Sequence, residues 1–320
     1  MVSDMEITVL VLDDVFDTGL AALLDTFETA GALAEGGAPA RVTVAGVRKQ
    51  VRTHQGLRVP VVPPPRARPD VVVVPALGCK TPATVAAALE RADVRDGCEL
   101  LRGWSRAGAR VTAACTATFV LGRAGLLDGR EATTTWWLAP FFRERFPTAR
   151  LDDTRMIVES GRVVTAGTAL AHLDLALWLV RRHSPALARA VARYLLFDAR
   201  PSQAAYVMPD HLAHADPLVE KFEAWARRHL VDFSMKAAAR AVGASERTIE
   251  RRVRTVLGRS PVSYVRDLRV ERAIHRLQTS DDTLDDIAAM VGYADAVTLR
   301  TLLRQKTGRG VRELRRSGGR

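Results

Sequence analysis

In the N-terminal half of the chain, short runs of apolar residues alternate with segments whose apolar residues recur at helical spacing. Four valine-rich runs predict strands buried on both faces of a sheet: Ile7–Leu12, Arg41–Val47, Asp70–Pro75 and Arg110–Ala114. Helical spacing predicts helices over Asp17–Ala30, Pro82–Leu89 and Thr116–Gly122. Strand and helix in this rhythm predict a parallel sheet that is covered by helices on both faces.

Two further strands and two helices complete this predicted α/β domain. Met156–Glu159 and Arg162–Thr165 are joined by a Ser-Gly turn, which predicts a hairpin appended to the sheet. Helices are predicted over Ala169–Val180 and Pro185–Leu196. His172 lies on an otherwise apolar helix, so we expect a hydrogen-bonded interior residue and not a ligand.

In the C-terminal third, one pattern of apolar and polar residues occurs twice. Met235–Pro261 reappears, diverged, as Leu284–Gly310. At an offset of 49 residues, the equivalent pairs are Ala239 and Ala288, Val242 and Val291, and Gly243 and Gly292. Each copy predicts a short helix, a turn that contains glycine, and a longer helix.

The longer helix of each copy is amphipathic and basic. In the first copy, Ser245 occupies the position expected of an N-cap, and the buried face is formed by Ile249, Val253 and Leu257. The remaining faces are polar or cationic, as in a helix-turn-helix that offers its second helix to the major groove. Two helical hairpins with solvated arginine faces are the alternative, which the repetition and the capping residues disfavour. The candidate DNA contacts are Ser245, Arg247, Thr248, Arg251 and Arg252 in the first copy, and Ala296, Thr298, Arg300 and Arg304 in the second.

The predicted helix that joins the copies, Tyr264–Gln278, sets the distance between them. Its buried stripe is expected at Val270, Ala273, Ile274 and Leu277. About 15 residues at about 1.5 Å each span roughly 22 Å. With the width of the flanking helices, the two recognition helices should lie about one DNA turn apart, near 34 Å. One chain should therefore contact two adjacent major grooves, at a site that is asymmetric because the copies differ.

Charge supports a nucleic-acid partner for the second domain. The 320-residue chain carries a formal charge of +11, and a length of this order suggests two domains. The segment from Asp216 onward contains 22 Lys and Arg but only 14 Asp and Glu, so most of the excess positive charge lies in the last third of the chain. The acidic N-terminus differs from a signal peptide, no apolar run approaches a membrane span, and three cysteines fit a reducing cytoplasm. We therefore expect a cytoplasmic protein with no membrane partner.

The C-terminal repeat resembles the AraC/XylS family of transcription regulators. The first copy carries the family's "LGxSP" ending as Leu257, Gly258, Ser260 and Pro261, and the second begins with Ile287–Tyr293, close to "IAxxVGF". Gly310 stands where the family has proline. The resemblance implies that this all-α double helix-turn-helix domain binds double-stranded DNA and regulates transcription.

Cys115 is the candidate for chemistry in the first domain. It follows the strand Arg110–Ala114 directly and precedes a helix, so it occupies a strand-to-helix elbow at the carboxyl edge of the sheet. A helix N-terminus at such an elbow lowers a thiol pKa and can supply an oxyanion hole. Geometry alone therefore makes Cys115 a candidate nucleophile.

The stretch from Cys115 to Trp137 resembles the PfpI-like, class I glutamine amidotransferase-like domain of GlxA-type regulators. The hairpin VESGRVVTAG and the segment HLDLALWLV extend the likeness. It implies a flavodoxin-like parallel sheet sandwich over 1–197 that binds an effector or dimerises, a linker over 198–215, and an AraC-type domain over 216–320. A homodimer through the first domain is expected.

The resemblance also bears on catalysis. Enzymes of the superfamily pair the elbow cysteine with an acid, which Asp17 would supply, and with a histidine at a position that holds Thr116 or Thr135 here. Without that base we expect no catalysis and no metal or other cofactor. The ligand-pocket candidates are Asp17, Gly78, Cys79, Cys115, Thr116 and Thr135. The alternative is an enzyme of the amidase or isonitrile-hydratase kind that uses Cys115.

Several weaker hypotheses stay open at this point. Cys79 lies near the same sheet edge as Cys115, so a disulfide sensor competes with two unlinked thiols. Cys98 is expected to be a small core residue. His211 and His214 with Asp210 or Asp216 have spacing that is only weak evidence for a metal site. An architectural nucleoid protein with little sequence preference is a third class of function.

Overall fold

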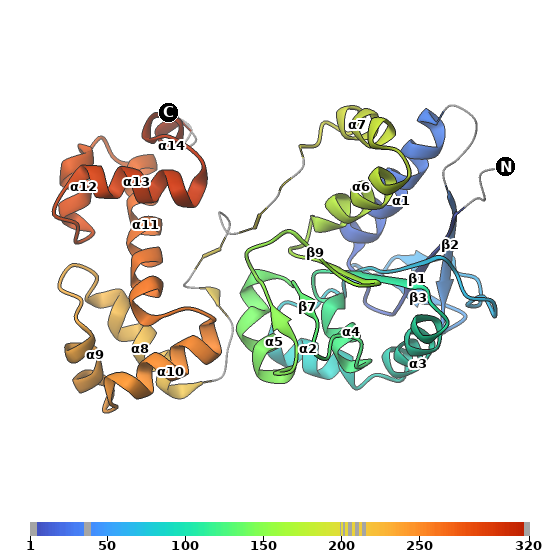
Figure 1. Ribbon diagram of the computed structural model, residues 1–320, viewed down its shortest axis with the longest axis horizontal. Helices are drawn as coiled ribbons and strands as arrows, with labels where there is room; N and C mark the ends of the chain where they lie inside the picture. Colours follow the sequence, from blue (N-terminus) through green and yellow to red (C-terminus); the bar gives the residue numbers. More distant parts are fainter. Residues whose placement is uncertain are drawn as a thin grey trace. The chain divides into compact units, whose positions relative to one another are not determined.

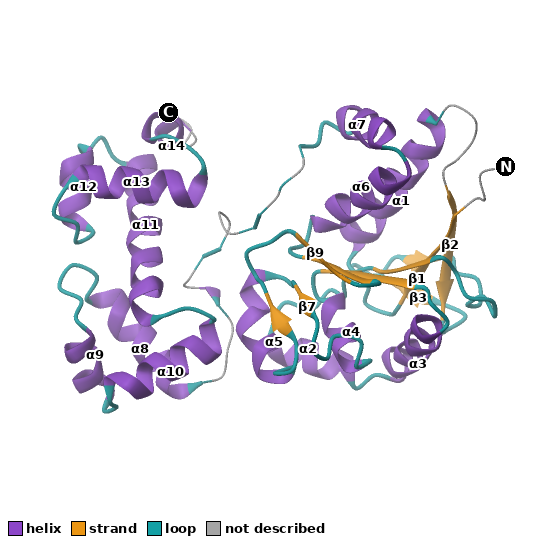
Figure 2. Cartoon of the chain, viewed as in Figure 1, coloured by secondary structure: helices purple, strands orange, loops and turns teal. Residues whose placement is uncertain are grey.

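The computed structural model describes residues 5–34, 40–198, 200, 202–203, 207–208, 211–212 and 216–316 (Figures 1 and 2). The chain divides into two compact units, Met1–Gln203 and Ala204–Arg320. The first is an α/β unit and the second is helical. His214 and Asp210, proposed as metal ligands, lie outside the described residues, and the assignment of a role to each predicted domain stays a prediction.

A six-stranded sheet with the order β2-β1-β5-β6-β10-β9 forms the centre of the α/β unit. Its strands are β1 (Met5–Val11), β2 (Ala40–Gly46), β5 (Val71–Val74), β6 (Arg110–Ala114), β9 (Ile157–Ser160) and β10 (Val163–Ala166). All neighbours pair in parallel except β9 and β10, which form an antiparallel hairpin at one edge. The predicted fold class is confirmed, and each predicted strand lies within two residues of its observed bounds.

Helices cover both faces of the sheet, because the strand side chains are apolar on both sides. One face carries α1 (Asp17–Leu33), α6 (Ala171–His183) and α7 (Pro185–Tyr194) (Figure 1). The other carries α2 (Pro82–Leu89), α3 (Ala92–Arg106) and α4 (Ala117–Arg123). Ile7, Val9 and Val11 of β1 pack toward α1 and α6, whereas Leu10 and Leu12 contact α3 at Gly97. The predicted sandwich is thus built from alternating sides of each strand.

Smaller elements that the hydrophobic pattern did not predict lie around this sheet. The pairs are β3 (Val51–Arg52) with β4 (Arg58–Val59), and β7 (Glu131–Ala132) with β8 (Arg150–Leu151). A 3₁₀ turn, η1 (Trp136–Leu138), leads into α5 (Ala139–Arg145). A strand of two residues is too short to show an alternation of apolar and polar positions, so the sequence pattern could not predict these pairs.

The helical unit contains two small cores joined by one long helix. Its elements are α8 (Pro217–Arg228), α9 (Met235–Val242), α10 (Glu246–Leu257), α11 (Pro261–Thr279), α12 (Leu284–Met290), α13 (Ala296–Thr307) and α14 (Val311–Arg316). The helix α11 supplies Tyr264, Val265 and Leu268 to the first core, and Val270, Ala273 and Leu277 to the second. Ile274 is only partly buried. The joining helix is longer than predicted, and its 19 residues span about 28 Å at about 1.5 Å each.

Caps fix the ends of the repeated helices as the sequence predicts. The Ser245 hydroxyl accepts a hydrogen bond from the Thr248 N–H at 3.1 Å, so it caps α10. Gly243 and Gly258 take left-handed conformations with φ of 70° and end α9 and α10. None of the described helices is long and apolar enough to cross a membrane.

His172 lies in the core between α1 and α6, as expected. It is fully buried, its Nε2 accepts a hydrogen bond from the Ala76 N–H at 3.0 Å, and its Nδ1 lies 2.6 Å from the Ala169 carbonyl oxygen. A Cβ on Gly19 of α1 would stand 2.6 Å from the ring, so only glycine allows this close approach. Burial, opposed only by the contact with Ala169, lowers the pKa of His172 to about 4.

This buried imidazole predicts a loss of stability in acid. An unfolded histidine takes up its proton near its ordinary pKa of 6.5 and the folded one only near 4. Stability should therefore be fully present above about pH 6.5 and fall by up to about 1.4 kcal/mol per pH unit between these values. Urea unfolding followed by tryptophan fluorescence at several pH values measures the slope. The His172→Gln variant, though less stable, should lose this part of the pH dependence, and equal slopes would contradict the assignment.

Candidate nucleic-acid interface and strand-to-helix elbow

The exposed face of α10 carries cations that no acidic side chain neutralises. Arg247 and Arg251 are exposed, lie one turn apart, and form no ion pair with a described residue. Arg254 differs, because its Nη2 lies 2.8 Å from the carboxylate of Glu250. The Arg252 guanidinium is also occupied by the Asp216 carboxylate, which caps α8. On α10, Arg247 and Arg251 are thus the predicted contacts whose guanidinium groups form no ion pair among the described residues.

The exposed face of α13 is partly apolar. Arg300 and Arg304 are exposed and form no ion pair with a described residue, while Ala296 is only 7% exposed. The Thr298 hydroxyl donates to the Asp295 carboxylate at 2.9 Å, so it helps to cap the helix. Val297, 67% exposed, was missed by the sequence analysis. A large aliphatic side chain left exposed beside arginines is a candidate contact for a thymine methyl group.

An ion-pair cluster ties the two halves of the helical unit together. Asp267 of α11 accepts from Arg259 Nη1 at 2.7 Å, and its other carboxylate oxygen lies 2.8 Å from Lys306 Nζ of α13. Arg259 lies two residues after the end of α10, so one carboxylate connects the segments of both recognition helices to the helix between them. All three side chains are less than 20% exposed. This partial burial makes the pairs stronger than ordinary surface ion pairs.

In the α/β unit, Cys115 forms the predicted elbow between β6 and α4. Its φ is 57°, a conformation that is rare for a residue with a side chain. The Cys115 N–H donates to the Ala166 carbonyl at 2.9 Å, and the Thr134 hydroxyl donates to the Cys115 carbonyl at 2.8 Å. The Thr116 hydroxyl donates to the Leu77 carbonyl at 2.7 Å. These bonds hold the elbow from both sides.

The environment of the thiol corrects the prediction of a lowered pKa. Cys115 is only 4% exposed, and this burial raises the pKa of the thiol to about 12, although hydrogen bonds to Thr116 oppose the shift. Burial also raises the pKa of Cys79 to about 11. Helix α4 has only seven residues, and its dipole does not offset the loss of water around the sulfur. Both cysteines are free thiols, and Cys98 is buried in the core as predicted.

The loop after β3 brings His54 to the same sheet edge, which the sequence analysis missed. Its Nδ1 lies 2.7 Å from the Asp14 carboxylate, and its ring stands over Gly78, where a Cβ would be 2.2 Å from it. No hydrogen bond joins His54 to a thiol in the part of the chain that the structure describes. A lone histidine between two weakly patterned strands carries no sequence signal, because only the fold brings it to the elbow.

The other pocket candidates lie around this edge but do not form a catalytic set. Asp17 begins α1, and one of its carboxylate oxygens accepts from the Gln55 N–H at 3.1 Å. Thr135 is fully buried before η1. Gln203, also fully buried, donates from Nε2 to the Thr134 carbonyl at 2.9 Å. The Cys115–Thr134–Gln203 series thus connects the elbow with the last residue of the α/β unit.

Comparison with known proteins shows the family to which the chain belongs. A sequence profile of the DJ-1/PfpI family matches residues 5–182, more than half of the chain. The chain belongs to the DJ-1/PfpI family. A helix-turn-helix domain profile matches residues 238–317, so this DJ-1/PfpI protein carries the second domain that its repeat predicts. The resemblance to AraC-family regulators of the GlxA type is confirmed.

Several curated relatives combine wide coverage with low identity. The HTH-type transcriptional regulator GlxA of Rhizobium meliloti is 29% identical over 228 residues, 68% of this chain and 69% of GlxA. The regulator GbdR of Pseudomonas aeruginosa is 26% identical over 210 residues, 64% of this chain but only 57% of GbdR. The match to GbdR thus spans less than two thirds of that protein's length.

A solved structure of an AraC family transcriptional regulator from Pseudomonas putida shares the fold. It superposes with a TM-score of 0.51 at 20% identity, over 60% of this chain and 99% of that one. At this identity the match supports the DJ-1/PfpI fold and not a common ligand.

The buried thiols of this DJ-1/PfpI protein should react slowly. At about pH 8, thiols with pKa values of about 11 and 12 are almost entirely protonated, and the thiolate is the reactive species. We expect iodoacetamide to label Cys79 and Cys115 at least tenfold more slowly in the native protein than in the urea-unfolded chain. Peptide mass spectrometry measures both rates. Rapid native labelling of Cys115 would restore a nucleophilic role.

The exposed arginines predict a graded response of DNA binding to substitution. Arg247→Ala, Arg251→Ala, Arg300→Ala and Arg304→Ala should each weaken binding. A lost phosphate contact lowers the slope of log K against log salt by about 0.9, and a lost guanine contact costs about 1–3 kcal/mol. Arg254→Ala is the matched control, because Glu250 already neutralises that guanidinium. Titrations by fluorescence anisotropy at several salt concentrations separate the two kinds of contact, and equal losses for all five variants would contradict the assignment.

Proposed function

We propose that this protein is a sequence-specific DNA-binding transcription regulator whose α/β unit senses a small molecule without catalysing a reaction. The observation that carries the proposal is the duplicated helix-turn-helix, in which Arg247 and Arg251 on α10, and Arg300 and Arg304 on α13, are exposed without acidic partners among the described residues. Such cations bind phosphates and guanine edges. The named relatives GlxA and GbdR are transcriptional regulators, which supports the same function.

The elbow supports a binding role for the α/β unit. Asp17 Oδ1 and Gln203 Oε1 are buried at the carboxyl edge of the sheet and find no hydrogen-bond partner among the described residues. Open α/β sheets bind ligands at this edge, and a polar ligand would satisfy such atoms. The proposed pocket includes Asp17, Gly78, Cys79, Cys115, Thr116 and Thr135. The hydrogen-bonded path through Thr134 to Gln203 offers a route from an occupied pocket to the end of the unit.

In the part of the chain that the structure describes, no histidine is hydrogen-bonded to the Cys115 thiol, which argues against the amidase alternative. A nucleophilic thiol needs a neighbouring base or a lowered pKa, whereas Cys115 has a pKa of about 12 and threonines at the two positions that the family's histidine would occupy. Cys115→Ser should therefore leave DNA binding intact. A homodimer through the α/β unit remains part of the proposal.

The geometry of the repeat gives the test of the DNA-binding proposal. Helix α11 is about 28 Å long, so α10 and α13 should enter adjacent major grooves on one face of the duplex, with centres about 10 base pairs apart. Since α10 offers arginines where α13 offers Val297, the two half-sites should differ in sequence. Hydroxyl-radical footprinting of the full chain on a selected site should show two protected grooves and no palindrome within them. Protection of a single groove, or of random DNA with equal affinity, would sink the proposal.

A further inference from the structure

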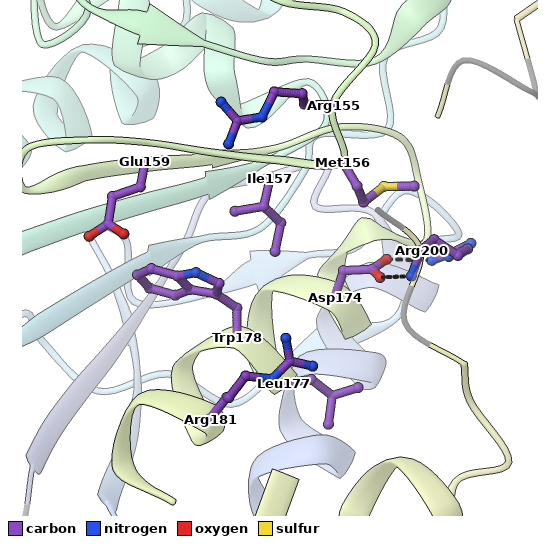
Figure 3. Close-up of a pocket in the computed structure, with 9 residues that line it drawn as sticks. All are labelled: Arg155, Met156, Ile157, Glu159, Asp174, Leu177, Trp178, Arg181 and Arg200. Atoms are coloured by element: carbon purple, nitrogen blue, oxygen red, sulfur yellow. Dashed lines mark hydrogen bonds and ion pairs between the residues drawn. The ribbon is translucent and has the colours of Figure 1, made fainter. Parts of the chain in front are cut away.

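A cleft of about 590 Å³ lies away from the elbow, between β9 and α6 (Figure 3). Arg155 stands on one side of it and Arg181 on the other, with Ile157 and Trp178 between them. The cleft belongs entirely to the α/β unit. Its two walls are the outermost strand of the sheet and the helix packed beside it, so its shape is set by regular secondary structure.

The acids in the cleft already have cationic partners. Asp174, 6% exposed, is paired with Arg200 at 2.6 Å and also accepts from the Arg200 backbone N–H at 3.2 Å. Glu159 is paired with Arg110 at 2.7 Å and with Arg182 at 3.4 Å. Both carboxylates are therefore neutralised, and neither is free to repel an anion that enters the cleft.

Two of the arginines in the cleft, by contrast, lack such partners. Arg155 and Arg181 are exposed and lie within ion-pair distance of no carboxylate among the described residues, although the Arg155 charge helps to lower the pKa of Asp152, which does not line the cleft. Their guanidinium groups each present planar pairs of N–H donors, which match the two oxygens of a carboxylate. The cleft therefore has an excess of cationic donors over acceptors, on two opposite walls.

The floor between these arginines is apolar and rigid. Met156 and Leu177 are 1% and 2% exposed, and Ile157 is partly buried. The Arg110 and Arg182 guanidinium carbons lie 5.6 Å and 5.1 Å from the centre of the Trp178 ring, which fixes the ring in place. Inorganic phosphate would leave this apolar surface uncovered, whereas an organic anion would bury it.

We propose that this cleft binds a small organic carboxylate, with its carboxylate held by Arg155 and Arg181 and its apolar body packed against Ile157 and Trp178. As a ligand site the cleft is independent of DNA binding. Its regulatory meaning rests on the proposed function, because the ligand would then be an effector that acts at a site separate from the elbow.

Arg200 gives the cleft a connection to the end of the α/β unit. Its guanidinium donates to the Leu170 carbonyl at 3.0 Å and stands 4.9 Å from the centre of the Phe197 ring. Taking Arg200 away from Asp174 would leave a buried carboxylate unpaired, which is costly. Arg200 therefore stays with Asp174, and a carboxylate that enters the cleft is left to Arg155 and Arg181.

Calorimetric titration of the full chain at low salt tests the site, with 2-naphthoate as the probe. The neutral 2-naphthylmethanol and inorganic phosphate serve as the two comparison ligands. We expect 2-naphthoate to bind with a Kd below about 1 mM, and each comparison ligand to bind at least about tenfold more weakly. Arg155→Gln and Arg181→Gln should each weaken binding of 2-naphthoate about tenfold. Arg41→Gln, an exposed arginine on the opposite edge strand β2, should have no effect.

Tryptophan fluorescence provides a second readout that does not depend on the heat of binding. The probe should quench the wild-type protein, and Trp178→Phe should remove that response. Failure of 2-naphthoate to bind, equal binding of the neutral alcohol or of phosphate, or indifference to both arginine substitutions would overturn the site. DNA binding measured on the same samples separates the two proposals. A protein that binds DNA and not the probe refutes only this site, and the reverse result refutes only the regulator function.

Discussion

The Arg269 guanidinium of α11 holds the two helix-turn-helix motifs of this protein in one fixed arrangement. Its Nε donates to the Leu230 carbonyl of the first half at 2.8 Å, and its guanidinium lies 5.3 Å from the centre of the Tyr293 ring in the second. Between these residues, Gly292 has φ of 85°, and a Cβ there would stand 2.8 Å from Val231 Cα. The glycine in the second turn is thus required both for its conformation and for the close approach of the first half.

This contact matters because α11 alone would not fix where the recognition helices point. A helix sets the distance between its ends, but each small core could still rotate about it, since the two cores share no buried residue. The Asp267 carboxylate, bound by Arg259 and Lys306, and the Arg269 guanidinium each join the two halves through different residues. The proposed entry of α10 and α13 into adjacent grooves would depend on both. Pre-organisation of this kind reduces the entropy that binding must overcome.

The sequence predicted the parts of the structure that depend on local pattern. The strands β1, β5 and β6, the capped helices of the repeat and the interior position of His172 all follow from apolar spacing or from a capping residue. The contacts of Arg269 with Leu230, of Asp267 with Lys306 and of His54 with Asp14 could not be predicted, because each joins residues that are far apart in the chain and have no periodicity. The same limit applies to Arg252, whose pairing with Asp216 depends on how α8 packs against α10. The pKa of Cys115 was predicted in the wrong direction, since burial at an elbow depends on what the surrounding loops cover.

The burial of Cys115 also bears on the backbone strain at the elbow. A non-glycine residue at φ of 57° costs of the order of 1–3 kcal/mol, and it persists only when its surroundings hold it. Here the Cys115 backbone is held by Ala166 and Thr134, and Thr134 is held in turn by Gln203. In an enzyme of this fold such strain would present a nucleophile to a substrate, whereas here burial raises the pKa of the Cys115 thiol to about 12. The strained elbow depends instead on hydrogen bonds that reach Gln203 at the end of the α/β unit, and it is through these bonds that the proposed ligand would act.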